Sequence, residues 1–297
     1  MARSDRAPSI VIAGGDADPN LESLGNQLER LGIPFLPMLV GASSHPRFHW
    51  NLENDELRFD GKRISPAALF IRYDVFTNLS DGGRPESAGR ANAWYTAVAS
   101  WAAAHDEVRL LNRQHSSHLL KPQQLMAARA CGLAIPKTLV TNDLDQLARL
   151  NVAKSVVKPV AGGDYCRELA DVLPSTDERG RAAASPAIVQ ERLEPPELRI
   201  YRVGRTFLSF DVSSDALDYR TSNNTAVTFR KNEQTLIAPL RKLMNVLRLD
   251  FGAADFKTCP KTGRFLFLEV NSSPMFAAFD AASDGAVSRA IAHYLRS

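Results

Sequence analysis

The sequence predicts an α/β fold of the α+β kind, with mixed sheets covered by amphipathic helices. Three observations favour this class. An apolar run, residues 9–13, leads through Gly14-Gly15 into a helix with leucines at helical spacing, which is a β-loop-α unit. Further apolar runs alternate with helical segments along the chain. Near the C-terminus, two strand-like runs flank a loop that contains Pro260 and Gly263, and this predicts an antiparallel hairpin.

Composition limits the classes of function. With 297 residues, of which 44% are hydrophobic, the chain is long enough for two or three compact subdomains. A net charge of +3, without a basic run, gives no reason to expect a nucleic-acid partner. The three cysteines have no CxxC spacing, which is typical of reduced thiols. No N-terminal apolar segment and no run of membrane-spanning length occurs, so we expect a cytoplasmic protein without a membrane partner.

The first block, residues 1–112, is expected to be an N-terminal α/β domain. Its first helix contains leucines from Leu21 to Leu31 and is ended by Gly32. A second apolar run, residues 67–71, is followed by a helix over about 91–104. Residues 81–89 are rich in Gly, Pro and Ser and predict a mobile loop.

Two further blocks are expected at residues 113–193 and 194–297. The central block contains a helix that begins near Lys121, a strand that runs from Ser155 into Gly162-Gly163, and another strand near 187–193. The last block contains further predicted elements: strands near 198–203 and 206–212, a helix near 233–247, the hairpin, and a helix that ends at Leu295.

The predicted hairpin carries a candidate metal site. Alternate side chains of a strand share a face, so Glu269 and Asn271 point the same way, and pairing with residues 249–257 brings Asp255 beside Glu269. Two carboxylates and an amide oxygen suit Mg²⁺. The alternative is a charged edge on an ordinary hairpin. An unpaired carboxylate in an apolar strand costs roughly several kcal/mol, so we expect a cation or donor to compensate Glu269.

The order of these pieces resembles the ATP-grasp superfamily, in particular its RimK and glutathione-synthetase-type branch. The resemblance covers residues 110–297, and residues before them are similar to a pre-ATP-grasp domain. It implies a site for ATP and Mg²⁺, the latter expected as two ions. The implied residues are Lys121 and Lys158 for phosphates, Gln190, Glu191 and Leu193 for adenine, Glu197 for ribose, and Asp255, Glu269 and Asn271 for metal.

The chemistry that this resemblance implies is carboxylate ligation. A carboxylate receives the γ-phosphoryl group of ATP, and a nucleophile displaces phosphate from the acyl phosphate to give an amide or ester. Arg199 and Arg220 are the candidates to stabilise that intermediate. Ala253 stands where D-alanine-D-alanine ligases carry an arginine, so that activity is not indicated.

The substrate class stays open between a peptide and an amino acid. Asp218-Tyr-Arg220 and Met275–Phe279 are similar to segments of ATP-grasp ribosomal-peptide maturases, whereas Glu269–Pro274 is closer to RimK. A homo-oligomer is also left open.

Each element has a simpler structural interpretation. Lys121 could be a solvated residue at a helix start, Glu197 could pair with Arg199 on the surface, and Gly162-Gly163 could be only a turn rather than a phosphate-binding loop. Two other functional classes remain: an ATP-grasp kinase that stops after phosphoryl transfer, and a nucleotide-binding module without catalysis.

Overall fold

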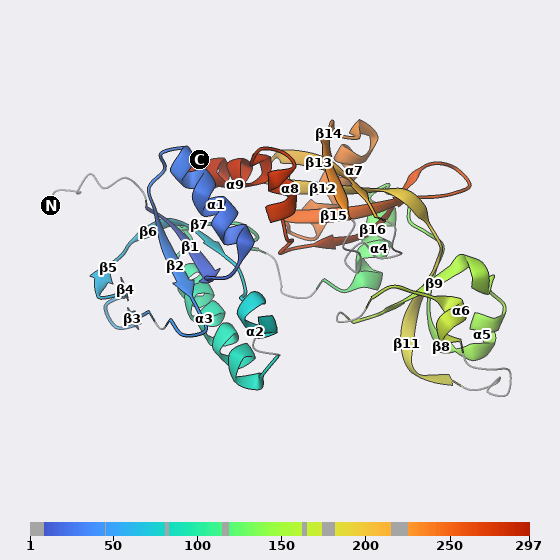
Figure 1. The fold of residues 1–297 in the computed structure, drawn as a ribbon, viewed down its shortest axis with the longest axis horizontal. Coiled ribbons are helices and arrows are strands. Elements are labelled where there is room, and N and C mark those ends of the chain that lie inside the picture. Colours follow the sequence, from blue (N-terminus) through green and yellow to red (C-terminus); the bar gives the residue numbers. More distant parts are fainter. Residues whose placement is uncertain are drawn as a thin grey trace. The chain divides into compact units, whose positions relative to one another are not determined.

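The computed structural model describes residues 9–44, 46–80, 83–114, 119–161, 165–173, 182–214 and 225–297. They belong to two units, Met1–Arg113 with Met275–Ser297, and Gln114–Pro274. The structure confirms the predicted α/β (α+β) fold class, because helices cover sheets in both units (Figure 1). The expectation of mixed sheets is wrong for the described residues, because each sheet is either purely parallel or purely antiparallel. The three-block division of the sequence stays a prediction.

The first unit is built on a parallel sheet with the strand order β2-β1-β6-β7. Its elements are β1 (Ser9–Gly15), α1 (Pro19–Arg30), β2 (Phe35–Val40), β3 (Phe48–Asn51), β4 (Glu56–Phe59), β5 (Lys62–Arg63), β6 (Pro66–Ile71), α2 (Phe76–Ser80), α3 (Pro85–Ala103), β7 (Arg109–Leu110), α8 (Ala277–Ala281) and α9 (Ala286–Arg296).

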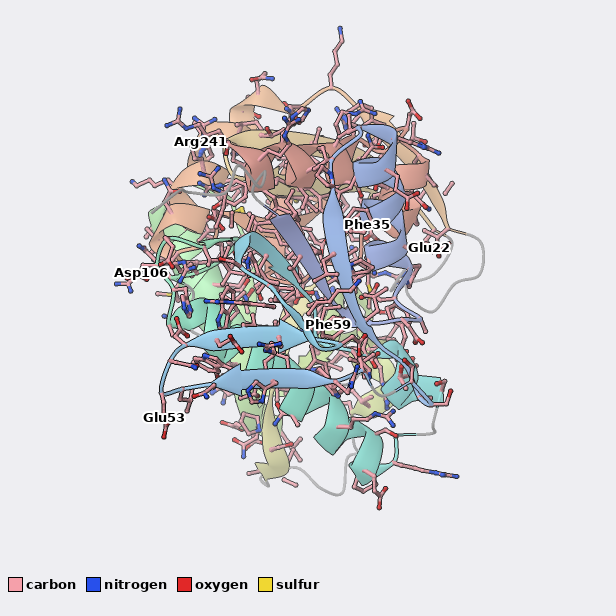
Figure 2. All side chains as sticks on the ribbon, turned by 90° about the vertical axis from the view of Figure 1, so that its left-hand side faces the viewer. Glu22, Phe35, Glu53, Phe59, Asp106 and Arg241 are labelled. Carbon is pink, nitrogen blue, oxygen red and sulfur yellow. The ribbon has the colours of Figure 1, made fainter. Side chains whose placement is uncertain are left out.

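Helices cover this sheet through apolar stripes. Leu21, Leu24 and Leu28 of α1 are buried, as their helical spacing predicts. Helix α3 contributes Val98 and Trp101 to a core that also contains side chains of β1 and β6. In Figure 2, Glu22 lies on the outer side of α1, opposite that apolar stripe. Strand β1 and helix α1 therefore form the β-loop-α unit expected from the sequence.

Helix α3 begins earlier than predicted. It starts at Pro85, so residues 85–89 are helical and the expectation of a loop there is wrong. A proline at the first helical position has its φ already fixed near the helical value, and its missing N–H would have had no partner there. Because the segment is rich in Gly, Pro and Ser, the sequence predicted a loop where the helix in fact begins.

A small antiparallel sheet, β3-β4-β5, was not predicted from the sequence. Its strands are two to four residues long, which is too short for a clear alternation of apolar and polar side chains. Leu57 and Phe59 of β4 are nevertheless buried in the same core as α3. Figure 2 shows Phe59 on this small sheet and Glu53 in the turn between β3 and β4.

The last 23 residues, Met275–Ser297, pack in the first unit although they follow the predicted hairpin in sequence. Helix α9 lies beside α1 (Figure 1). The side-chain oxygen of Asn20 in α1 accepts hydrogen bonds from the backbone N–H groups of Phe276 and Ala277, at 2.5 and 2.9 Å. Phe276 itself is fully buried. These contacts fix the C-terminal segment within the unit.

The second unit contains two sheets, with the strand orders β10-β9-β11-β8 and β14-β13-β12-β15-β16. Its elements are α4 (Lys121–Ala130), β8 (Thr138–Asp143), α5 (Leu144–Ala148), η1 (Val152–Lys154), β9 (Ser155–Pro159), β10 (Arg167–Glu168), α6 (Leu169–Val172), β11 (Ala182–Glu191), β12 (Glu194–Val203), β13 (Thr206–Ser213), β14 (Ala226–Arg230), α7 (Gln234–Val246), β15 (Phe251–Thr258) and β16 (Phe265–Asn271).

One face of the five-stranded sheet carries the main core of this unit. Helices α4 and α7 cover it with apolar side chains such as Leu125 and Leu243, which pack on Ile200, Phe256 and Phe267 of the strands. The predicted hairpin is confirmed as β15 and β16, which pair antiparallel across the turn at residues 259–263. The opposite face of β12, β15 and β16 is therefore available for polar side chains.

The described cysteines are free thiols, as expected from their number and spacing. Among the described helices, none has the length and hydropathy needed to cross a membrane.

Candidate functional site

The candidate site is a polar face formed by three adjacent strands. Arg199 of β12 lies opposite Asp255 of β15, and Asp255 lies opposite Glu269 of β16. Side chains two residues apart share a face, so Glu197 and Asn271 belong to the same row. The neighbours between them in sequence, such as Leu198 and Val270, are buried in the core on the other side. The sequence prediction that Asp255 stands beside Glu269 is confirmed.

A β-bulge determines which way Glu269 points. Phe256 pairs with Phe267, but the preceding residue Asp255 pairs with Glu269, so Leu268 is the extra residue of β16. If β16 were regular through Leu268, Glu269 would lie two residues from Phe267 on the same face and would point into the apolar core. The bulge moves Glu269 to the face of Asp255 while Phe267 stays buried. Bulges of this kind re-aim side chains beside functional sites.

Arg199 neutralises the first carboxylate. Its Nη1 lies 3.1 and 3.3 Å from the two carboxylate oxygens of Asp255, and its Nε donates to the hydroxyl oxygen of Tyr201 at 3.1 Å. Arg199 is only 5% exposed, so this ion pair is largely withdrawn from water. The Asn271 side-chain amide also donates to Asp255, over a longer 3.4 Å. Asp255, Arg199 and Asn271 thus form one connected group.

Lys121 neutralises the second carboxylate. It is the first residue of α4, and its Nζ lies 3.3 Å from Oε2 of Glu269. Both side chains are about one quarter exposed, at 27% and 25%. The sequence predicted a cation or donor next to Glu269, and in the structure Lys121 is that cation. Lys121 does stand at a helix start, as its alternative interpretation has it, and in addition it forms this ion pair.

Glu197 pairs with Lys257 rather than with Arg199. The Nζ of Lys257 lies 2.6 Å from a carboxylate oxygen of Glu197, and these two side chains are opposite each other on β12 and β15. Their exposure is low, at 10% and 16%. Lys257 was missed from the sequence, although its position two residues after Asp255 placed it on the same face. Tyr201, two residues after Arg199, could have been found in the same way.

The other predicted nucleotide residues belong to or follow the four-stranded sheet. Lys158 is half-buried on β9, opposite Ile188 of β11. The described residues give Lys158 no ion-pair partner. Its role as a phosphate ligand stays a prediction.

The predicted adenine segment includes the end of β11. Gln190 is buried and donates from Nε2 to Oγ1 of Thr138 at 3.0 Å. The Glu191 carboxylate accepts a hydrogen bond from the backbone N–H of Lys137, also at 3.0 Å. Leu193 packs with Cys259 and Leu266 in a small apolar cluster. The two polar side chains therefore fix the strand, and the assignment of these residues to adenine stays a prediction.

Three predicted residues lie outside the part of the chain that the structure describes. They are Arg220 in the proposed acyl-phosphate role and the pair Gly162-Gly163 in the proposed phosphate loop.

The donor set of the polar face fits a divalent metal such as Mg²⁺. Asp255 and Glu269 supply carboxylate oxygens and Asn271 an amide oxygen, the hard ligands that Mg²⁺ prefers. Within the described residues, no group of three or more His, Cys, Asp or Glu side chains could hold a metal, and the candidate set combines two carboxylates with the amide of Asn271. A pair of carboxylates balanced by two cations is also a plausible structural network.

Comparison with known proteins gives matches among solved structures only. No protein-family model matches the sequence, and no curated protein matches it either. Solved structures do match over nearly the whole chain. The ATP-grasp ligase PsnB, complexed with a minimal precursor, superposes with a TM-score of 0.75 at 22% sequence identity, and the match covers 97% of each chain.

Two further structures give the same result. The macrocyclase MdnC from Microcystis aeruginosa MRC, bound with its precursor peptide MdnA, has a TM-score of 0.71 at 20% identity, over 97% of this chain and 99% of that one. A RiPP-associated ATP-grasp ligase from Chryseobacterium gregarium, in complex with ADP and a leader and core peptide, has a TM-score of 0.72 at 19% identity, over 97% and 96%. The fold expected from the resemblance is thereby confirmed.

Proposed function

We propose that this chain is an ATP-dependent carboxylate ligase that forms an amide or ester through an acyl phosphate. The observation that carries the proposal is the register of the polar face, where Asp255 and Glu269 are adjacent and each is balanced by a cation. The ATP-grasp fold supports it.

Each residue of the polar face has a role in the proposal. Lys121 and Lys158 bind phosphate oxygens as point charges, and Lys121 then contacts phosphate in place of Glu269. Asp255, Glu269 and Asn271 hold Mg²⁺, for which we propose two ions. When bound, these ions neutralise the charge that develops on the phosphoryl oxygens.

The remaining roles concern the adenosine and the intermediate. Gln190, Glu191 and Leu193 line the adenine site, and Glu197 accepts from the ribose hydroxyls. The guanidinium of Arg199, rigidly oriented by Asp255 and Tyr201, donates to the acyl phosphate, and Arg220 is a second candidate for that contact. In the reaction, the substrate carboxylate oxygen attacks the γ-phosphorus and ADP leaves. A nucleophile then attacks the acyl carbon, the C–O bond to phosphate breaks, phosphate leaves with the electron pair of that bond, and the nucleophile loses its proton.

We propose a peptide as the carboxylate substrate. The matched structures of PsnB, MdnC and the Chryseobacterium gregarium ligase contain precursor or leader and core peptides, and the match to their fold covers 97% of this chain. A RimK-like ligase that uses a free amino acid is the second candidate, favoured by Glu269–Pro274. The three divisions at residues 1–112, 113–193 and 194–297 belong to this proposal as N-terminal, central and metal-binding domains. The free cysteines support a reducing, cytoplasmic location, and a homo-oligomer is compatible with the proposal.

Intact mass spectrometry of candidate substrates, incubated with the protein, ATP and Mg²⁺, tests the proposal. A ligase joining two groups of one peptide removes one water for each bond formed and releases one ADP. A kinase would instead add a phosphoryl group to the product. A binding module would leave the mass unchanged and release no ADP above background.

Substrates for this test are acidic peptides that also carry Ser, Thr or Lys, with free glutamate as the amino-acid arm. The Glu269→Gln variant is the negative control. ADP release that accompanies a stable phosphorylated product in every arm would replace the ligase proposal by the kinase.

A further inference from the structure

A pocket in the first unit lies between α1 and the segment that joins α8 to α9. Side chains of α1 form one wall, and α8 with Asp284 and Gly285 forms the other. The cavity volume is about 270 Å³. This is close to the lower end of the range for small-molecule sites, about 300 to 1,000 Å³. All of its lining residues belong to the first unit, so it is formed without any residue of the polar face.

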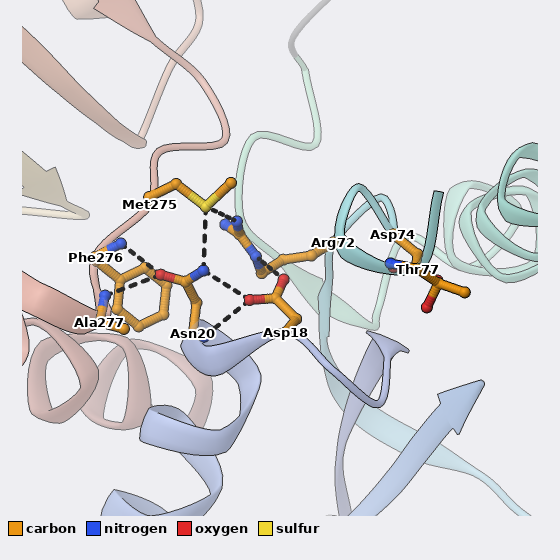
Figure 3. A network of polar contacts seen from close by, with 8 residues as sticks. All are labelled: Asp18, Asn20, Arg72, Asp74, Thr77, Met275, Phe276 and Ala277. Atoms are coloured by element: carbon orange, nitrogen blue, oxygen red, sulfur yellow. Dashed lines mark hydrogen bonds and ion pairs between the residues drawn. The ribbon is translucent and has the colours of Figure 1, made fainter. Parts of the chain in front are cut away.

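Hydrogen bonds between α1 and α8 hold the two walls together. The side-chain oxygen of Asn20 accepts from the backbone N–H groups of Phe276 and Ala277, where α8 begins (Figure 3). Ser23, about one turn further along α1, donates to a carboxylate oxygen of Asp280 at 2.6 Å. The pocket is therefore a built feature of the fold.

The carboxylates of the pocket already have partners. Asp280 is only 2% exposed, and one of its oxygens accepts from the backbone N–H groups of Val287 and Ser288 at the start of α9, at 2.9 and 3.0 Å. Its other oxygen accepts from two serine hydroxyl groups. The carboxylate of Asp284 is 93% exposed and lies 3.8 Å from the guanidinium of Arg289. Selection of a ligand therefore falls to the other polar groups of the pocket.

Gln27 presents a buried amide to the cavity. It lines the pocket, it is only 6% exposed, and its amide forms no hydrogen bond to any of the described residues. The amide oxygen lies against Gly285, where a Cβ would be only 2.5 Å away, so the glycine makes room for it. An amide offers a donor and an acceptor side by side. Because an unsatisfied buried polar group is costly, a ligand group that both donates and accepts would stabilise this arrangement.

Arg30 supplies a positive charge next to this amide. It follows Gln27 by three residues on α1, and the Cβ atoms of such a pair lie on one helix face, about 5 to 6 Å apart. It is exposed, and the described residues give it no ion-pair partner. A guanidinium favours carboxylate and phosphate groups, to which it donates two parallel hydrogen bonds. The pocket thus combines a buried donor and acceptor with a cation at helical spacing.

We propose that this pocket binds an N-acylated α-amino acid with a free carboxylate, either as a small molecule or as the last residue of a peptide. Arg30 binds the carboxylate. In an extended chain the N–H and C=O of one residue point the same way. The N–H of the ligand therefore donates to Oε1 of Gln27, and one carboxylate oxygen accepts from its Nε2. Ala277 and Ala281 leave the facing wall free of large side chains. This site goes beyond the proposed ligase function and does not depend on it.

Isothermal titration calorimetry with the full chain, without ATP or metal, tests this assignment. The probes are N-acetyl-L-alanine and a peptide that ends in the same residue, N-acetyl-triglycyl-L-alanine. We expect saturable binding of both. A peptide that binds more tightly would identify a peptide terminus as the ligand, and equal affinities would identify the small molecule. Absence of saturable binding by either probe would overturn the assignment.

Three further compounds separate the charge from the amide. N-acetyl-L-alaninamide lacks the carboxylate, O-acetyl-L-lactate has an ester in place of the amide and so lacks the N–H, and inorganic phosphate offers the charge alone. Each should bind about tenfold or more weakly than N-acetyl-L-alanine, because each loses a hydrogen bond to Arg30 or to Gln27. Equal affinity for inorganic phosphate would overturn the assignment, since an adventitious anion on Arg30 would then account for the binding.

Arg30→Gln tests the contact to the carboxylate. The variant should bind N-acetyl-L-alanine about tenfold or more weakly. Arg296→Gln is the matched control, because Arg296 is also an exposed arginine in the last turn of a helix of the same unit. It should bind as the wild type does. Unchanged affinity in Arg30→Gln would overturn the assignment.

Gln27→Met tests the contact to the amide, because methionine is similar in length and lacks the amide group. Binding should weaken about tenfold, whereas Tm should stay the same or rise, since the variant no longer buries an amide without a partner in the protein. A purely structural role for Gln27 would instead lower Tm and leave the affinity unchanged, which would contradict the proposal. Arg30→Gln, at an exposed side chain, decides the matter if Gln27→Met does not fold.

Discussion

Lys158 is the residue whose surroundings depart most from an ordinary structural role. A lysine on a β-strand that follows two valines and has no ion-pair partner among the described residues loses hydration without electrostatic compensation. A bound phosphate would provide that compensation. The opposite holds for Lys121 and Arg199, whose charges are balanced by Glu269 and Asp255.

Replacing Lys158 by alanine should weaken nucleotide binding. Loss of one charge-assisted contact lowers the affinity by about tenfold to a hundredfold. Calorimetric titration with a non-hydrolysable ATP analogue and Mg²⁺ measures it, and Lys154→Ala, at an exposed lysine just before β9, is the control. Equal affinities in both variants would remove Lys158 from the site.

His105 should make stability depend on pH. Its Nδ1 faces the carbonyl oxygen of Trp101 and its Nε2 faces a carboxylate oxygen of Asp55, each at 2.7 Å. The carbonyl of Trp101 first, and Asp55 after it, raise the pKa of His105 above its ordinary value. His105 in turn lowers the pKa of Asp55.

The direction in which stability changes with pH follows from the raised pKa of His105. The protonated imidazolium stabilises the fold fully below the unfolded-state pKa, about 6.5, and this contribution is lost as the pH rises through the higher folded-state pKa. Tm should therefore fall over that window, and His105→Gln should flatten the slope. An NMR titration that gives His105 a pKa at or below that of a free histidine would contradict this.

At the scale of elements, the hairpin could be predicted and the bulge could not. Alternating residues and the turn at Pro260 and Gly263 were sufficient to place Asp255 beside Glu269. Leu268, however, is as apolar as its neighbours, and only the packing of Phe267 in the core shows that it is the extra residue. The strands β3 to β5 were missed because they are too short for a clear alternation, and the start of α3 at Pro85 because its segment is rich in Gly, Pro and Ser.

The hydrogen bonds between Asn20 of α1 and the C-terminal segment should contribute to the stability of the fold. Asn20→Ala removes the acceptor of two backbone N–H groups, those of Phe276 and Ala277, of which Phe276 is buried. Leaving buried donors unpaired costs about 1 to 3 kcal/mol each, so unfolding in urea should shift to a lower midpoint. Asn26→Ala, at an exposed asparagine of the same helix, should leave the midpoint nearly unchanged. Equal midpoints in the two variants would show that the anchor carries no stability.

For the whole molecule, the proposed site exists only in the folded second unit. Lys121, Arg199, Asp255 and Glu269 come from a helix and three strands that span about half of the sequence. Individual motifs indicated each residue, but the partner of Glu197 could be assigned only once the strand register was known, and that of Glu269 only once α4 was placed on the sheet. Neither the substrate nor the pocket in the first unit could be read from these motifs.

Electron paramagnetic resonance of Mn²⁺, used in place of Mg²⁺ with ADP, tests the central claim most directly. The account predicts ADP-dependent Mn²⁺ binding by the wild type, its loss in Glu269→Gln and Asn271→Ala, and no loss in Glu194→Gln, an exposed glutamate on β12. Glu269→Gln removes only a partly exposed ion pair worth about 0 to 1 kcal/mol, so the fold should survive. Equal ADP-dependent Mn²⁺ binding in all four proteins would show that the polar face is a structural ion-pair network and no metal–nucleotide site.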